Sequence, residues 1–118
     1  MNIEELRDYC LQKKGVTESF PFGEDTLVFK VADKMFLLTS LSEPHSFNAK
    51  CEPERAVELR EQYEEVKPGY HMNKKHWNTV HTNGRLNDKQ LRVMVDHSYE
   101  LVLASLSKKM QKEIGEIE

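Results

Sequence analysis

The chain has 118 residues, of which 38% are hydrophobic and 31% charged, and its formal net charge is -3. This length suits one domain with its own core, and the composition lies far from that of disordered chains. No apolar run approaches the ~18 residues of a membrane span, and the first ten residues carry acids where a secretion signal carries bases. We therefore expect one cytoplasmic domain over residues 1–118, with Cys10 and Cys51 as free thiols.

The first half of the chain predicts one helix followed by strands. Asn2 and Glu5 have the spacing of a capping box and begin the helix, which should stop near Gly15. Residues 19–23 predict an edge strand that contains a proline. Two apolar, β-branched runs follow within residues 26–40 at the spacing of a hairpin, and alternation over residues 45–51 predicts another strand.

The second half predicts two helices with a strand between them. Residues 53–63 form a helix that opens with a proline, and residues 77–82 have strand character. Asn87 and Gln90 provide a second capping box before a long helix with apolar residues at helical spacing. The charged residues from about 110 to 118 predict a frayed tail.

The resulting order of elements, α-β-β-β-β-α-β-α, predicts an α+β fold with two layers. Helices should cover one face of an antiparallel sheet and leave the other face partly open to solvent. An open sheet face can bind a partner, or it can be an ordinary solvated surface.

An acid-free segment, residues 66–87, is the most unusual feature of this acidic chain. It holds four bases, three of the five histidines and the only tryptophan, whereas the rest of the chain carries 20 acids against 13 Lys and Arg. Segregated positive charge indicates a surface for an anionic partner, such as DNA or an acidic protein. The candidate nucleic-acid-binding residues are Lys67, Tyr70, His71, Lys74, Lys75 and Arg85.

The alternative for this segment is structural. A lone tryptophan in a small domain is most often buried, so Trp77 and Tyr70 would anchor a loop to the sheet while the bases are merely solvated. Four bases are also few for a dedicated nucleic-acid binder, and a sequence pI near 6.0 adds long-range repulsion from DNA.

Metal and thiol chemistry have less support in the sequence. His71, His76 and His81 recur every five residues, which matches neither one face of a helix nor one face of a strand, so we predict no metal site and no cofactor. Cys51 precedes a helix start and is the best candidate for a nucleophile. It also falls on the apolar face of its predicted strand, which favours a role in core packing.

Three blocks of sequence resemble a known family. They read KCEPE at residues 50–54, PGYHMNKKHWNTV at residues 68–80 and DHSYELV at residues 96–102. Together with the PFG at residues 21–23 they resemble the MmcQ/YjbR family of small bacterial proteins over nearly the whole chain. Glu52 departs from the family pattern, which has Asp before the proline. Because Glu is a poorer N-cap than Asp, we expect a weaker helix start at this position.

The resemblance implies a compact α/β domain related to secretion-chaperone and CyaY-like architectures. It also implies DNA binding through a double-wing arrangement of strands. We therefore hypothesise a non-enzymatic binding module with DNA as the leading partner. A chaperone-like module that binds an acidic protein is the alternative, and a thiol-dependent enzyme is the least favoured class.

Overall fold

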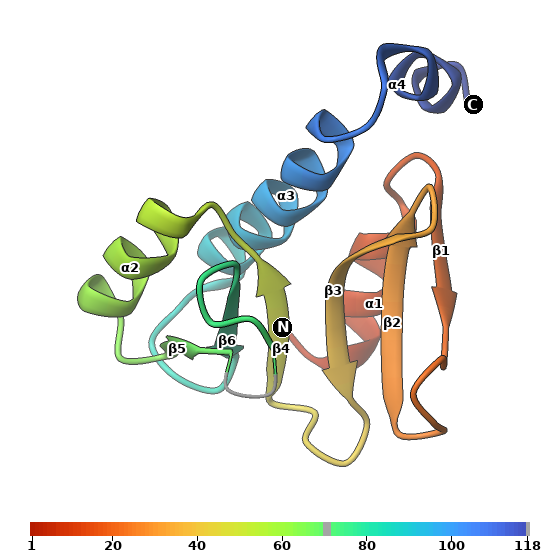
Figure 1. Cartoon of the computed structure of the whole chain (residues 1–118). Coiled ribbons are helices and arrows are strands. Elements are labelled where there is room, and N and C mark those ends of the chain that lie inside the picture. Colours follow the sequence, from red (N-terminus) through yellow and green to blue (C-terminus); the bar gives the residue numbers. More distant parts are fainter. Residues whose placement is uncertain (70–71, 118) are drawn as a thin grey trace.

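The computed structural model describes residues 1–69 and 72–117. The elements in chain order (Figure 1) are α1 (Ile3–Leu11), β1 (Val16–Ser19), β2 (Thr26–Val31), β3 (Lys34–Ser40), β4 (Ser46–Lys50), α2 (Pro53–Gln62), β5 (Val66–Pro68), β6 (Trp77–His81), α3 (Asp88–Ala104) and α4 (Lys108–Gly115). The predicted α+β class is confirmed.

Within the described residues the sheet has six strands in the order β1-β2-β3-β4-β6-β5, and neighbouring strands are antiparallel. The predicted hairpin joins β2 to β3 through Ala32 and Asp33, whose φ angles are 48° and 64°. A two-residue turn with positive φ at both positions matches the right-handed twist of the flanking strands. The pairing shifts between Phe29 and Lys30, which marks a bulge in this hairpin.

One face of the sheet is covered by helices. Figure 1 shows α1 and α3 behind the sheet, and α3 packs across β2, β3 and β4. The core between these layers contains Phe29, Phe36, Phe47, Leu91 and Val95, all fully buried. Burial of each large apolar side chain contributes about 1.5–3 kcal/mol, so this layer supplies most of the fold's hydrophobic stabilisation. The opposite sheet face carries no helix in the described structure, and it faces the viewer in Figure 1.

Side-chain caps begin α1, α2 and α3 where the sequence predicts. Both capping boxes are confirmed, Asn2 with Glu5 and Asn87 with Gln90. The Glu52 carboxylate accepts hydrogen bonds from the backbone N–H groups of Glu54 and Arg55, at 3.0 and 2.9 Å. These two bonds lower the pKa of Glu52, so it caps α2 as an anion despite the low preference of glutamate for this position.

The structure differs from the sequence prediction at three places. The edge strand β1 ends at Ser19, whereas residues 19–23 were expected to form it; a turn closed by the N–H of Gly23 and the carbonyl of Phe20 occupies most of that segment. β5 has only three residues and was not predicted. Where a frayed tail was expected, α4 forms with a cap at Ser107, and its Ile114 is buried.

Candidate nucleic-acid interface

Three lysines lie on alternate strands of the helix-free face of the sheet, which we call the open face. Lys30 on β2 pairs with Met35, Lys50 on β4 pairs with Trp77, and Lys67 on β5 pairs with Thr79. Cross-strand partners share a face of the sheet, and side chains alternate between faces. Lys30, Lys50 and Lys67, here named the lysine row, therefore all project from the face opposite the core.

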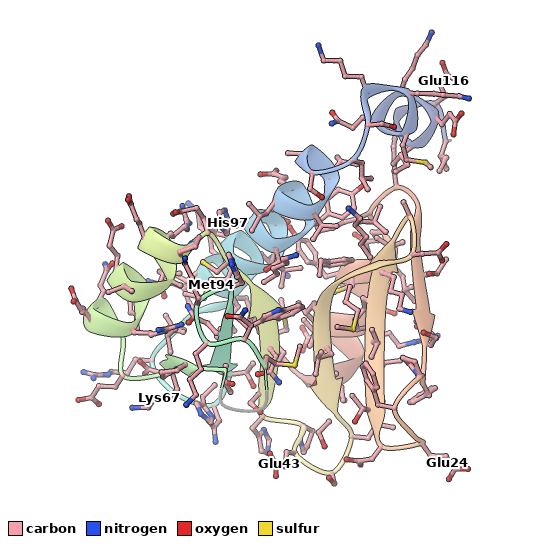
Figure 2. The ribbon with its side chains drawn as sticks, in the orientation of Figure 1. Glu24, Glu43, Lys67, Met94, His97 and Glu116 are labelled. Carbon is pink, nitrogen blue, oxygen red and sulfur yellow. The ribbon has the colours of Figure 1, made fainter. Side chains whose placement is uncertain are left out.

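The lysine row occupies alternate strands of the sheet. β3 separates β2 from β4, and β6 separates β4 from β5, so adjacent lysines are two strand spacings apart. With strands ~4.8 Å apart, this places about 10 Å between neighbouring lysines in the direction across the sheet. Lys67 is exposed and marks the edge of the sheet, where it is labelled in Figure 2.

The strands contribute no carboxylate to the open face. The six strands contain one acid, Glu18 of β1, and it lies opposite Phe29 on the core side of the sheet. There it forms an ion pair with Arg7 of α1 at 2.7 Å. Within the described residues the lysine row takes part in no ion pair. The open face is thus positive, although the chain as a whole carries a net charge of -3.

A small apolar cluster sits on the open face beside the lysine row. Val28, Leu38 and Trp77 are buried there, and Met35 and Met72 pack against them. Trp77 is 7% exposed and therefore anchors the loop that connects β5 with β6 rather than offering a surface for stacking. Trp77 is thus buried, as the structural interpretation of the acid-free segment expected.

Gly69 allows this loop to approach Trp77 closely. Its N–H donates to the carbonyl of Trp77 at 3.0 Å. A Cβ atom at position 69 would lie 3.0 Å from the Cβ of Trp77, which is tighter than most real Cβ contacts. The glycine therefore suits the close contact between the loop and β6, and a larger residue would require a small shift there.

Arg60 of α2 fixes the other end of the same loop. Its guanidinium donates to the side-chain oxygen of Asn78 at 2.6 Å, and to the carbonyl oxygens of Lys74 and Trp77. Asn78 is itself buried and donates to the carbonyl of Ala56. These bonds hold the loop by its backbone, so that its exposed lysine side chains are carried by a fixed support.

The predicted site residues do not form one uniform patch. Lys67 belongs to the lysine row, whereas Lys74 and Lys75 lie on the loop between β5 and β6. Lys75 lines an open depression together with Glu54 and Glu58 of α2, so acids border its charge on one side. Tyr70 and His71 lie outside the described residues.

The positive charge of Arg85 is compensated by two neighbouring glutamates. Its guanidinium lies 3.4 Å from Glu64 and 3.8 Å from Glu65, and its backbone N–H donates to Glu65 at 2.7 Å. Backbone hydrogen bonds, first of all that from Arg85, lower the pKa of Glu65, so this partner stays charged. Arg85, Glu64 and Glu65 line a groove beside β5. Lys67 also borders this groove, and its charge contributes to the lowered pKa of Glu65, although it forms no ion pair there.

Sequence reasoning missed two members of the lysine row. Lys30 and Lys50 lie outside the acid-free segment, Lys30 within the largely apolar β2 and Lys50 at the end of β4. The alternation of side chains along a strand could have identified both lysines, because each lies between two buried residues and must therefore point to the opposite face. Strand alternation combined with charge sign would have pointed to this face.

The candidate thiol is buried. Cys51 is 4% exposed, and burial raises the pKa of its thiol to about 11. Next to it, Nε2 of His97 accepts a hydrogen bond from the N–H of Glu52 at 3.2 Å. Such an environment holds Cys51 as a neutral thiol and fits a packing role.

Among the residues that the structure describes, no three His, Cys, Asp or Glu side chains are grouped so as to hold a metal ion. Within the same residues no helix combines the length and apolar character required to cross a lipid bilayer.

The architecture defines an α+β protein whose antiparallel sheet has helices on one face and lysines on the other. The YjbR family model matches residues 11–101, and the chain belongs to the YjbR family. The family resemblance stated from the sequence is thereby confirmed.

Relatives match over almost the whole chain. It is 35% identical over 113 residues to the uncharacterized protein YjbR of Escherichia coli strain K12, covering 95% of this chain and 96% of that protein. It is 35% identical over 112 residues to the uncharacterized protein YbdF of Escherichia coli O157:H7, covering 94% and 92%.

Solved structures share the fold. The crystal structure of a Deinococcus radiodurans protein with a DUF419 domain superposes with a TM-score of 0.89 at 38% identity, covering 96% of this chain and 87% of that one. The crystal structure of a Pseudomonas syringae protein gives a TM-score of 0.72 at 28% identity, covering 86% and 98%.

Proposed function

We propose that this protein is a non-enzymatic module that binds nucleic acid, with DNA as the leading ligand, on the open face of its sheet. The observation that carries the proposal is the lysine row on a sheet face whose strands contribute no carboxylate. Several positive groups on one face of a sheet suit a polyanion whose charges recur along its backbone. Lys74 and Lys75 lie on the loop between β5 and β6, next to the edge strand that carries Lys67.

The arrangement favours contacts to phosphates over reading of bases. The open face offers lysines, which act as point charges, and the tryptophan in its middle is buried. Binding should therefore depend little on sequence and fall steeply with salt. Three neutralised phosphates predict a log-log slope near -3, because each phosphate contributes about -0.9 with duplex DNA.

The test is a titration of fluorescein-labelled duplex DNA, followed by anisotropy at several salt concentrations. Substitution of the lysine row by alanine should abolish binding at low salt. The matched control is Lys108→Ala with Lys109→Ala and Lys112→Ala, which removes the same charge from α4. Absence of binding by the wild type, or equal loss in both variants, contradicts the proposal.

An acidic protein is the second candidate ligand of the same face. The net charge of -3 favours this alternative, because a long DNA polyanion is repelled over a greater distance than a short acidic segment. A poly-glutamate peptide and the DNA duplex separate the two ligands in direct competition. If a low concentration of the peptide displaces bound DNA, the acidic-protein partner is supported. If a low concentration of DNA displaces bound peptide, nucleic acid is supported.

A further inference from the structure

A second surface, opposite in charge to the lysine row, lies at one end of the sheet. Residues 15–29 and residues 35–49 contain no Lys or Arg. Thr26 pairs with Ser40, so the loop before β2 and the loop after β3 emerge side by side. In Figure 2 the labelled Glu24 and Glu43 mark these two loops, at the lower end of the sheet.

Exposed apolar side chains gather on the same loops. Phe22 is 65% exposed, Phe20 47% and Leu41 43%. The other large hydrophobic residues exposed in the described structure lie on or beside the helices. We name this surface the acidic tip; its members are Phe20, Phe22, Glu24, Asp25, Leu41 and Glu43.

The acidic tip is held together by Asp25. Its carboxylate accepts hydrogen bonds from the hydroxyls of Ser40 and Ser42, at 2.5 and 2.9 Å, and from the N–H of Ser42 at 2.9 Å. The carbonyl of Asp25 accepts from the N–H of Leu41 at 2.7 Å. Both loops are thereby fixed to each other, and a preformed surface loses little conformational entropy when it binds.

We propose that the acidic tip docks a partner protein through a segment that presents an apolar side chain flanked by Lys or Arg. Exposed aromatic residues on ordered loops are characteristic of the centres of protein interfaces. The carboxylates of Glu24 and Glu43 beside them favour a basic partner and repel nucleic acid, anionic membranes and acidic proteins.

This proposal is independent of nucleic-acid binding. The lysine row projects from the open face, whereas the acidic tip is formed by the loop that joins β1 to β2 and the loop that joins β3 to β4. The two surfaces have opposite charge and select different partners. Either one can fail experimentally without affecting the other.

The probe is a short fluorescent peptide in which a Phe-Leu pair is flanked by lysines. One control peptide replaces Phe-Leu by Ser-Ser, and another replaces the lysines by glutamates. Anisotropy gives the affinities, and amide chemical shifts of the labelled protein locate the site. We expect binding of the basic apolar peptide alone, with shifts over residues 20–25 and 41–45.

Variants of exposed residues assign the binding to the tip. Phe22→Ser with Leu41→Ser should weaken peptide binding by about tenfold or more. The matched control, Val57→Ser with Val93→Ser, changes exposed apolar residues on α2 and α3 and should leave binding unchanged. The DNA affinity should be equal in all three proteins.

Four outcomes overturn the proposal. These are absence of peptide binding, equal binding of the glutamate peptide, shifts centred on the open face, and equal loss in both variants. Light scattering of the protein alone tests a fifth outcome, which is a dimer that Phe22→Ser dissociates. In that case a second copy of the chain would occupy the acidic tip.

Discussion

His97 on α3 accepts a hydrogen bond at Nε2 from the backbone N–H of Glu52, 3.2 Å away at the start of α2. The two residues are 45 positions apart in the chain, so this bond joins the long core helix to the cap of α2. Only a neutral imidazole can accept it, because a protonated ring donates at both nitrogens. The contact is therefore sensitive to pH.

The stability of the fold should fall as the pH drops below the ordinary His pKa of 6.5. Burial, and then the charge of Arg55, lower the pKa of native His97, while Glu100 and Glu52 oppose this shift. The unfolded chain therefore takes up a proton first, and stability is lost as pH falls from 6.5 to the lowered native pKa. Above 6.5 this contribution is complete.

Urea unfolding at about pH 7.5 and about pH 5.5 measures this loss. His97→Gln keeps a side-chain acceptor but cannot titrate, so it should reduce the difference in unfolding free energy between the two pH values. His45→Gln, in an exposed loop, is the control and should retain the difference. An unchanged pH dependence in His97→Gln contradicts the assignment.

Asp96 connects α3 to α1 through two side chains. Its Oδ1 accepts from the hydroxyl of Tyr9 at 2.6 Å and from Nζ of Lys13 at 2.5 Å. Desolvation, then the bond to Asp96, raises the pKa of Tyr9 to about 12, so its hydroxyl remains a donor at neutral pH. Asp96→Ala should cost about 1–3 kcal/mol, because both partners lose their acceptor.

A double-mutant cycle isolates the Tyr9–Asp96 contact. Tyr9→Phe and Asp96→Ala should be less than additive in chemical denaturation, with a coupling free energy of about 0.5–1.5 kcal/mol. Arg7→Ala, which removes an exposed ion pair with Glu18, should destabilise the fold less than Asp96→Ala does, and the two effects should be additive. Full additivity of Tyr9→Phe and Asp96→Ala would show that this hydrogen bond does not stabilise the fold.

Both cysteines should react slowly with iodoacetamide in the native protein near neutral pH. Burial raises the pKa of Cys10 to about 12 and that of Cys51 to about 11, which leaves very little thiolate. Peptide mapping by mass spectrometry follows each thiol separately, and labelling in denaturant provides the comparison. Rapid native labelling of Cys51 alone would restore the thiol-enzyme hypothesis.

Local features of the fold could be predicted from the sequence, whereas features set by distant contacts could not. The capping boxes at Asn2 and Asn87 involve residues three positions apart, and both were predicted. β5 exists because residues 66–68 pair with β6, and no periodicity shows in three residues. The tail forms α4 with Ile114 buried next to Gly15, a contact that no local pattern contains.

The candidate site follows the same rule. Lys67 could be predicted from the acid-free segment, but the face it shares with Lys30 and Lys50 depends on which side the helices cover. The partners of Arg85 lie 20 and 21 positions earlier in the chain, at Glu65 and Glu64. The site predicted from charge along the sequence therefore included Arg85, whose charge is compensated, and omitted Lys30 and Lys50.

Arg85 and Lys67 should consequently differ in their effect on DNA binding. Lys67→Ala removes a charge from the lysine row and should weaken binding equally for all DNA sequences, with the salt slope reduced by about 1. Arg85→Ala removes a charge that Glu64 and Glu65 already balance, so the affinity should change by less than about twofold. Anisotropy titrations of both variants against the same duplex compare them directly. A larger loss in Arg85→Ala than in Lys67→Ala would place the contact at the groove beside β5 and contradict binding on the open face.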